Sequence, residues 1–254
     1  MSPPPYRTAF VTGASSGIGE ALARKLAAEG IEVVLAARRA GSLRAIATEI
    51  GRAGGKAYVR SLDVSDPRVA VEAIQALDDE LGGLDLVVAN AGRGEGKWGG
   101  KLEYDDCAPV IALNVAGATA TLTAVLPRMV ARGRGHLVGI SSLAAYRGLP
   151  KFAAYCASKA YLSTFLESLR IDLRGTGVHV TDIRPGFVKT ELTKDNGKMP
   201  FAMTAEAAAE TIWRAIRTQK AVHAFPLPTA TATRVATLLP GPVYDRVVGG
   251  RPRK

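Results

Sequence analysis

Tyr155 and Lys159 stand four positions apart in a stretch whose apolar residues recur at helical spacing. Residues at i and i+4 lie on one face of a helix, so a phenol and an ammonium group would sit side by side. Such a pair could transfer a proton to or from a bound molecule. The same spacing also arises by chance, so the pair needs support from the rest of the chain.

A glycine-rich segment near the N-terminus offers a different chemistry. Thr12 begins the run TGASSGIG, which follows an apolar strand-like stretch and precedes a helical one. Backbone N–H groups at a helix N-terminus bind phosphate, and glycines let a ligand approach the backbone closely. A tight turn without a ligand is the alternative, although the place of the run at the first strand-to-helix junction favours a phosphate site. Its candidate binding residues are Gly13, Ser15, Ser16, Gly17, Ile18 and Gly19.

The end of the second expected strand carries two arginines. Dinucleotide-binding folds usually have an acidic residue here, which accepts a hydrogen bond from the ribose 2′-hydroxyl. This chain has Arg38 and Arg39 instead. Because a guanidinium can hold a 2′-phosphate, the pair favours NADP(H) over NAD(H), which stays possible. The alternative is that both arginines only cap a surface turn.

These groups need a scaffold, and the chain alternates short β-branched runs with longer helical ones. Strands are predicted over residues 8–11, 32–36, 58–62, 84–89, 136–141, 178–183 and 221–225, and helices over 18–29, 67–81, 109–131, 152–174 and 205–218. Such alternation predicts one α/β domain, a doubly wound Rossmann sheet of about seven parallel strands flanked by helices. We assign residues 1–226 to a dinucleotide-binding catalytic domain and 227–254 to a basic, proline-punctuated tail.

Composition narrows the class of protein. The net charge is +10, but lysine and arginine are scattered and aromatic residues make up only 6%, so no nucleic-acid partner is expected. The two cysteines and three histidines show no ligand spacing, which predicts neither a disulfide nor a metal site. No uninterrupted apolar run approaches the ~18 residues of a membrane span, and we expect a cytoplasmic protein.

Several further motifs fall in order along the chain: Asp63-Val64, Asn90-Ala91-Gly92, Asn114, Ser142 and Pro185-Gly186. Together with TGASSGIG and the Tyr155/Lys159 pair, they make residues 6–225 resemble the short-chain dehydrogenase/reductase family. The resemblance implies an NAD(P)(H)-dependent oxidoreductase that interconverts a carbonyl and a secondary alcohol. It also implies a homodimer or homotetramer, formed through the helices at 109–131 and 152–174.

The resemblance assigns a role to each motif residue. Tyr155 would be the general acid/base, with its pKa lowered by Lys159, and Ser142 would hydrogen-bond the substrate oxygen. Lys159 would also hold the nicotinamide ribose, and Asn114 would support a water in a proton relay. The remaining residues would line the cofactor site: Asp63, Val64, Asn90, Ala91, Gly92, Pro185, Gly186, Val188 and Thr190. A non-catalytic dinucleotide-binding redox sensor is the alternative, which would not need this set of proton-transfer groups.

Residues 187–203 follow the sixth strand and are expected to form a flap over the substrate. Its inner side would be apolar, through Phe187, Leu192, Met199, Phe201 and Met203, and its outer side basic, through Lys189, Lys194 and Lys198. This pattern suggests a hydrophobic small-molecule substrate. In the tail, Pro240-Gly241-Pro242 must divide any helix into two short amphipathic pieces. These pieces could dock on the body or a neighbouring subunit, or rest on an anionic membrane surface.

Overall fold

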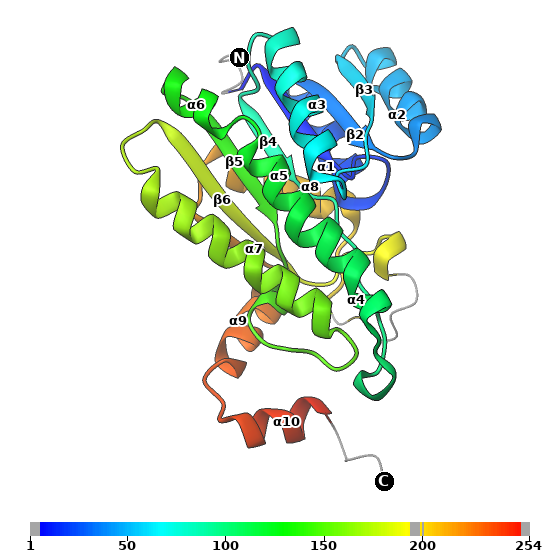
Figure 1. The fold of residues 1–254 in the computed structure, drawn as a ribbon, viewed down its shortest axis with the longest axis vertical. Coiled ribbons are helices and arrows are strands. Elements are labelled where there is room, and N and C mark those ends of the chain that lie inside the picture. The colour runs from blue at the N-terminus through cyan, green and yellow to red at the C-terminus, as the bar shows by residue number, and fades with distance from the viewer. Residues whose placement is uncertain (1–5, 194–198, 200, 250–254) are drawn as a thin grey trace.

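The structure is a computed structural model that describes residues 6–193, 199 and 201–249, without the side chain of Leu192. Seven parallel strands form one sheet in the order β3-β2-β1-β4-β5-β6-β7 (Figure 1). Their ends agree within two residues with the predicted ones, and the doubly wound single-domain fold is confirmed. The strands are β1 (Thr8–Thr12), β2 (Glu32–Ala37), β3 (Ala57–Ser61), β4 (Leu86–Ala89), β5 (Gly135–Ile140), β6 (Val178–Pro185) and β7 (Val222–Phe225).

Helices cover both faces of the sheet, so the central strands must be apolar on both sides. In β2, Val33 and Leu35 face one apolar cluster and Val34 faces the other. The first cluster is closed by α1 (Gly17–Ala28), α2 (Ala40–Arg52) and α8 (Ala205–Arg217). The second is closed by α3 (Pro67–Glu80), α5 (Ala118–Thr123), α6 (Leu126–Arg132) and α7 (Ala153–Asp172). This arrangement fixes the carboxyl ends of the strands, where ligands bind in such sheets.

The helix predicted over residues 109–131 differs from the observed one. Helix α4 (Tyr104–Ile111) begins five residues earlier, because Glu103 and Asp106 form a reciprocal capping box at its N-terminus. Pro109 therefore lies inside α4, and a π-helical segment, Ala112–Gly117, follows before α5. Such π-segments often mark functional sites, and this one contains Asn114.

By length and composition alone, the helical run Tyr104–Arg132 could cross a membrane. Half of its most apolar window is buried inside the fold, and Leu122 and Met129 belong to the core between the sheet and its helices. A buried core helix passes the same test. The run is therefore weak evidence for a membrane span.

The tail forms two helices, α9 (Leu227–Ala236) and α10 (Gly241–Gly249), which extend from the bottom of the body in Figure 1. The predicted interruption at Pro240 is confirmed. Arg147 Nη1 donates to the carbonyl oxygens of Ala236 at 3.2 Å and Leu239 at 3.0 Å, which attaches the end of α9 to the loop after β5. The apolar side chains that stay exposed on the tail are Leu227, Val235, Leu238, Val243 and Val247.

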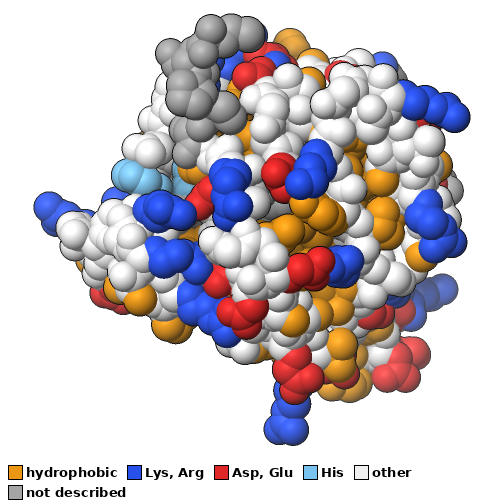
Figure 2. Space-filling view, turned by 90° about the horizontal axis from the view of Figure 1, so that it is seen from above, with side chains coloured by type: hydrophobic (Ala, Val, Ile, Leu, Met, Phe, Trp, Pro, Cys, Tyr) orange, Lys and Arg blue, Asp and Glu red, His pale blue; other side chains and the backbone are white. Residues whose placement is uncertain are grey.

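The basic charge is not gathered into one patch on the face drawn in Figure 2. Lysine and arginine side chains lie there among aspartate and glutamate. One buried carboxylate, Asp78, forms ion pairs with Arg132 Nη1 at 2.8 Å and with Arg128 Nη1 at 3.4 Å. Part of the positive charge therefore serves ion pairs within the fold.

Candidate active site

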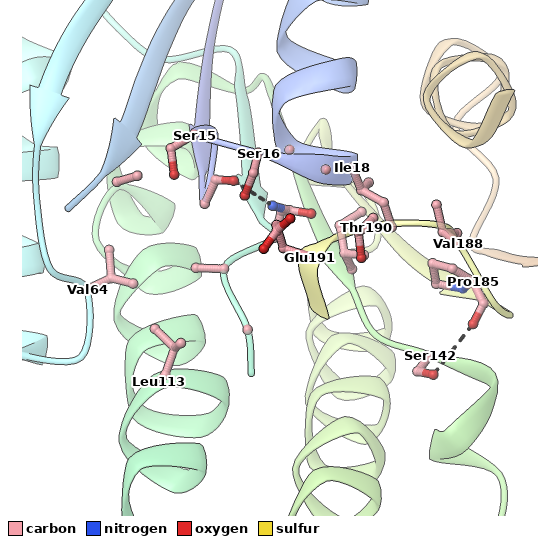
Figure 3. Close-up of a pocket in the computed structure, with 18 of the residues that line it drawn as sticks. Ser15, Ser16, Ile18, Val64, Leu113, Ser142, Pro185, Val188, Thr190 and Glu191 are labelled. Atoms are coloured by element: carbon pink, nitrogen blue, oxygen red, sulfur yellow. Dashed lines mark hydrogen bonds between the residues drawn. The ribbon is translucent and has the colours of Figure 1, made fainter. Parts of the chain in front are cut away.

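The carboxyl ends of the strands open into a cavity of about 410 Å³. It lies where the strand order reverses between β1 and β4, which is where open α/β sheets bind their ligands. Figure 3 shows Ser15 and Ser16 on one side of it and Ser142, hydrogen-bonded to Pro185, on another. Of the predicted site residues, these line the cavity: Gly13, Ser15, Ser16, Gly17, Ile18, Gly19, Arg38, Arg39, Asp63, Val64, Asn90, Ala91, Gly92, Ser142, Tyr155, Lys159, Pro185, Gly186, Val188 and Thr190.

The glycines of the first loop are required by the backbone. Gly13 and Gly17 have φ angles of 66° and 60°, which side chains rarely allow. A Cβ on Gly19 would lie 2.4 Å from the carbonyl oxygen of Gly13, so α1 begins directly against the loop. Ser16 precedes α1 without a side-chain cap hydrogen bond. The first turn of α1 therefore lines the cavity with the positive end of a helix, which suits a phosphate.

Arg39 folds back over this loop. Its Nη2 donates to Ser16 Oγ at 2.7 Å and to Ser15 Oγ at 3.0 Å. Arg38 is 73% exposed, and its Nη1 lies 3.7 Å from Asp63 Oδ2. Two guanidinium groups thus border the side of the cavity that follows β2, in the place where an acidic residue would favour a free ribose hydroxyl.

Thr12 joins the end of β1 to the loop after β4. Its Oγ1 accepts from the backbone N–H groups of Asn90 at 3.0 Å and Ala91 at 3.1 Å, and Asn90 Nδ2 donates to Thr12 O at 2.8 Å. A Cβ on Gly92 would lie 3.3 Å from Lys159 Nζ. This loop therefore forms the floor of the cavity between the glycine loop and Lys159.

Tyr155 and Lys159 share one face of α7, as their spacing predicts. Lys159 Nζ donates to Ile140 O at 2.8 Å and lies 5.7 Å from the centre of the Tyr155 ring. Ser142 follows β5 directly, and its Oγ accepts from Ala144 N at 3.0 Å. A phenol, a hydroxyl and a buried amine therefore meet at one end of the cavity.

Asn114 is buried and does not line the cavity. Its Oδ1 accepts from Arg93 N at 2.9 Å, and its Nδ2 donates to Arg93 O at 2.8 Å and to Ser158 Oγ at 2.9 Å. Both amide protons are thus used inside the protein. Asn114 therefore connects the loop after β4 to α7, a structural role that the sequence did not indicate.

The family model for short-chain dehydrogenases matches residues 7–200, most of the chain. The chain belongs to the short-chain dehydrogenase family. An uncharacterized oxidoreductase of Myxococcus xanthus is 53% identical over 241 residues, which cover 94% of this chain and 95% of that protein. The protein is therefore an oxidoreductase of this family, and the resemblance found in the sequence is confirmed.

Solved structures of other dehydrogenases share this fold. An alcohol dehydrogenase from Thermococcus sibiricus, complexed with 5-hydroxy-NADP, is 28% identical with a TM-score of 0.78, over 86% of this chain and 94% of that one. A short-chain dehydrogenase from Burkholderia phymatum, in complex with NAD, is 23% identical with a TM-score of 0.85, over 100% and 99% of the two chains. The second likeness shows the fold alone. Among these structural neighbours both NAD and NADP occur.

The residues of this short-chain dehydrogenase fit a dinucleotide. The glycine loop and the start of α1 supply unencumbered backbone for a pyrophosphate, and the floor from Asn90 to Gly92 leads from there to Lys159. Asp63 Oδ1 accepts from Ser65 N at 3.0 Å and from Ser65 Oγ at 2.7 Å. These hydrogen bonds lower the pKa of Asp63, so its carboxylate is charged at neutral pH and can accept a further hydrogen bond.

The ionisation of Tyr155 and Lys159 departs from the sequence prediction. Burial raises the pKa of Tyr155 above its usual value, while a hydrogen bond with Ser142 opposes that change. Burial also lowers the pKa of Lys159 to about 8, and the charge of Asp182 opposes this. The predicted lowering of the Tyr155 pKa by Lys159 is therefore not found, because burial of the phenol outweighs its hydrogen bond with Ser142.

The flap differs in part from its predicted arrangement. Its base is closed by backbone hydrogen bonds between Lys189 N and Met203 O and between Met203 N and Phe187 O. Met203 packs against the core, and Phe201 is 65% exposed instead of facing inward, with a φ of 55°. Lys194, Lys198 and the side chain of Leu192 lie outside the described residues.

Some residues of the site were missed in the sequence. Leu113, Ser141, Glu191 and Thr193 also line the cavity. Ser141 Oγ donates to the buried Asp182, which also accepts from Arg184 Nε at 2.7 Å. A serine beside Ser142 and a carboxylate inside a strand carry no spacing signal, so only the pairing of β5 with β6 reveals them.

Proposed function

We propose that the protein interconverts a carbonyl compound and a secondary alcohol, with NADP(H) as cofactor and Tyr155 as the general acid/base. The observation that carries the proposal is that one cavity is lined by a phosphate-binding loop, two arginines and the Ser142, Tyr155 and Lys159 side chains. A redox sensor would need the loop and the arginines alone. The proton-transfer groups favour turnover.

In the reductive direction, Tyr155 Oη donates its proton to the carbonyl oxygen of the substrate. Ser142 Oγ donates a hydrogen bond to the same oxygen and stabilises the charge that develops on it. A bound nicotinamide supplies or accepts the hydride. In the oxidative direction, the Tyr155 phenolate takes the proton from the substrate hydroxyl, and a charged Lys159 stabilises that phenolate.

The raised pKa of Tyr155 suits the reductive direction, because the phenol keeps its proton until the substrate oxygen takes it. In the cofactor-free protein Lys159 loses its charge near pH 8. Cofactor hydroxyl and phosphate groups that accept from Lys159 would favour the ammonium form and raise that value. Cofactor binding would thereby keep Lys159 charged beside Tyr155, as the proton transfer requires.

The two arginines support NADP(H) as the preferred cofactor. A 2′-phosphate carries about two negative charges, and a guanidinium can hold it with two parallel hydrogen bonds. Arg38 is largely exposed, and its ion pair with Asp63 is long at 3.7 Å, so its guanidinium can turn toward such a group. Arg39 could join it by leaving Ser15 and Ser16.

The substrate is proposed to be hydrophobic. Phe152 packs edge-on against Tyr155, with ring centres 6.2 Å apart, so an aromatic side chain lies beside the phenol that would meet the substrate. The decisive test follows NADPH absorbance with the purified protein against ketones and aldehydes from small aliphatic to polycyclic, and NADP reduction with the matching alcohols. Turnover of any apolar member supports the proposal. Tight NADPH binding without turnover across the panel would favour the sensor.

We further propose that the protein is a homo-oligomer joined through the outer faces of α4 and α7. Tyr104 and Ile111 on the first helical run and Tyr161 and Ile171 on α7 are large apolar side chains exposed to solvent. Covering them in a subunit contact would remove this area from water. Light scattering coupled to gel filtration gives the subunit number, and Ile171→Glu should reduce it.

For the tail we propose contact with an anionic membrane surface. Residues 227–254 carry five basic residues against Asp245 alone. Leu227, Val235 and Leu238 recur at spacings of eight and three, so they share one face of α9 and the turn that follows. Exposed apolar side chains beside positive charge are typical of helices that lie on anionic lipid.

A further inference from the structure

Side chains from other residues hold both polar backbone groups of Tyr155. Helix α7 starts at Ala153, and its N-cap residue, Phe152, offers no side-chain acceptor. The N–H groups of the first turn of a helix lack partners within the helix, and a start without a cap frays readily. The residue that transfers the proton lies in this first turn, so an uncapped start would leave its position poorly defined.

Glu95 supplies the missing cap from another part of the chain. Its Oε1 accepts from Ala154 N at 2.7 Å and its Oε2 accepts from Tyr155 N at 3.0 Å. These are the second and third residues of α7, whose N–H groups an ordinary N-cap side chain would satisfy. A carboxylate at this place also interacts favourably with the positive end of the 20-residue helix.

The loop that carries Glu95 is itself fixed. Arg93, two residues earlier, exchanges hydrogen bonds of 2.9 and 2.8 Å with the Asn114 side chain. Lys97, two residues later, forms an ion pair of 2.6 Å with Asp106 at the start of α4. The carboxylate of Glu95 is thus held from both sides of the loop, not carried on a free chain.

The other end of the Tyr155 peptide is held by the same assembly. Ser158 Oγ donates to Tyr155 O at 2.7 Å and accepts from Asn114 Nδ2 at 2.9 Å. A Cβ added at Gly94 would lie 3.7 Å from Tyr155 Cδ2, so the loop backbone also runs alongside the phenol ring. Glu95 fixes the N–H side of Tyr155 and Asn114, through Ser158, fixes the carbonyl side.

We infer that Glu95 is a positioning residue for proton transfer, which caps α7 from the loop after β4 and thereby sets the place of the Tyr155 phenol. The inference rests on the proposed function, since it concerns the use of Tyr155 as acid/base. It predicts an effect on the chemical step and not on cofactor binding. A displacement of about 1 Å at a reacting group can lower a rate about 100-fold.

The test compares Glu95→Ala, Glu95→Gln and Glu95→Asp with wild type in kcat, KM and the Kd for NADPH. Glu95→Ala should lower kcat 10- to 100-fold and leave the Kd for NADPH within threefold. Glu95→Gln keeps one acceptor but turns an NH₂ group toward a backbone N–H, so its kcat should lie between those of Glu95→Ala and wild type. Glu95→Asp keeps both oxygens on a shorter side chain and should restore part of kcat.

Asp66 provides a matched control. Its Oδ1 caps α3 by accepting from Arg68 N at 3.1 Å and Val69 N at 3.3 Å, without touching α7. Asp66→Ala should lower the Tm by an amount similar to that of Glu95→Ala and keep kcat within twofold of wild type. If Glu95→Ala behaves in the same way, or if it weakens NADPH binding as much as it lowers kcat, the inference is wrong.

Amide hydrogen exchange separates this inference from the proposed function, because it needs no substrate. Peptides that cover residues 153–158 should exchange faster in Glu95→Ala than in wild type. Their exchange rate in Asp66→Ala should equal that of wild type. Unchanged exchange in Glu95→Ala would overturn the cap. Faster exchange in a protein that reduces no carbonyl compound would retain the cap and overturn the proposed function.

Discussion

In most proteins charged side chains are exposed and large apolar side chains are buried, and the cavity and the tail depart from this rule in opposite directions. At the cavity a lysine is buried to 95% among the ends of the strands, whereas on the tail Leu238 is 82% exposed. Burying an amine costs free energy unless it is neutralised or hydrogen-bonded, and exposing leucine forgoes the gain from removing apolar area from water. Departures of both kinds are expected at functional sites.

The two regions differ in how the departure is supported. Lys159 donates to a strand carbonyl, and the groups around it form a connected network through Ser158, Asn114 and the loop after β4. Among the described residues, the polar side-chain contacts between the tail and the body involve the loop after β5. Arg147 caps α9 and lies 4.0 Å above the Tyr244 ring, and Tyr244 Oη donates to Gly148 O at 2.8 Å. Changes at the cavity should therefore cost far more than changes at the tail.

The largest effect is expected at the phenol. Tyr155→Phe removes only the proton that is transferred, so it should lower kcat at least 1,000-fold and leave NADPH binding within threefold. Tyr161→Phe is the matched control, because it removes a second phenol from the same helix, where the hydroxyl contacts Thr119 on the outer side. Steady-state kinetics and fluorescence titration measure both variants. Activity of Tyr155→Phe within tenfold of wild type would contradict its role as acid/base.

A smaller effect should follow from the buried amine. Because the folded-state pKa of Lys159 is lowered to about 8, the folded protein loses this proton above pH 8 while the unfolded chain still keeps it. The stability of the cofactor-free protein should therefore rise with pH from about 8 toward 10, relative to Lys159→Met, by about 1.4 kcal/mol per unit. The raised pKa of Tyr155 is common to both proteins and cancels in the difference. Urea unfolding at pH 7.5, 8.5 and 9.5 measures it, and parallel curves would show that the amine is not desolvated.

The arginines should matter less, because they act at the exposed rim of the cavity. Arg38→Asp should weaken NADPH binding 10- to 100-fold and change NADH binding by less than threefold, since a carboxylate repels a 2′-phosphate but can accept from a 2′-hydroxyl. Arg44→Asp, which makes the same charge change on α2, is the control and should change neither Kd by more than threefold. A wild-type protein that already prefers NADH would contradict the NADP(H) assignment.

The same contrast explains what the sequence could predict. Strands buried on both faces leave long β-branched runs, and their ends were found within two residues. The groups at the cavity belong to short contiguous motifs, such as the glycine loop and the Tyr155/Lys159 pair, and these motifs were legible without a structure. Both signals are local, so neither depends on how distant segments meet.

The misses have local and long-range causes. The start of α4 was placed at Pro109 because the cap formed by Glu103 and Asp106 contains no serine or threonine signal. Phe201 was expected to face inward because apolar residues usually do, yet the base of the flap turns it out. The cap from Glu95 joins positions 60 residues apart along the chain, and the raised pKa of Tyr155 arises from burial by the folded chain around it.

The smallest effect on catalysis is expected from removal of the tail. This change also tests the comparison between the cavity and the tail most directly. A protein that ends at Pro228 loses the contacts of Arg147 and Tyr244 but none of the residues that line the cavity. Its kcat/KM for a small soluble ketone should stay within about fivefold of wild type, while its sedimentation with anionic vesicles at low salt should be lost.

A double variant, Leu238→Ser with Val247→Ser, sharpens this test because it keeps both tail helices and their attachment. Two exposed apolar side chains lose at most a few kcal/mol of lipid contact between them, which is enough to abolish weak peripheral binding. Val69→Ser, which removes an exposed valine from α3, should leave sedimentation unchanged. If the full-length protein never sediments with such vesicles, the tail docks on the body or on a neighbouring subunit and the membrane proposal is wrong. If the double variant dissociates an oligomer instead, the exposed tail residues are a subunit contact. The tail would then follow the ordinary rule of burial, and only the cavity would depart from it.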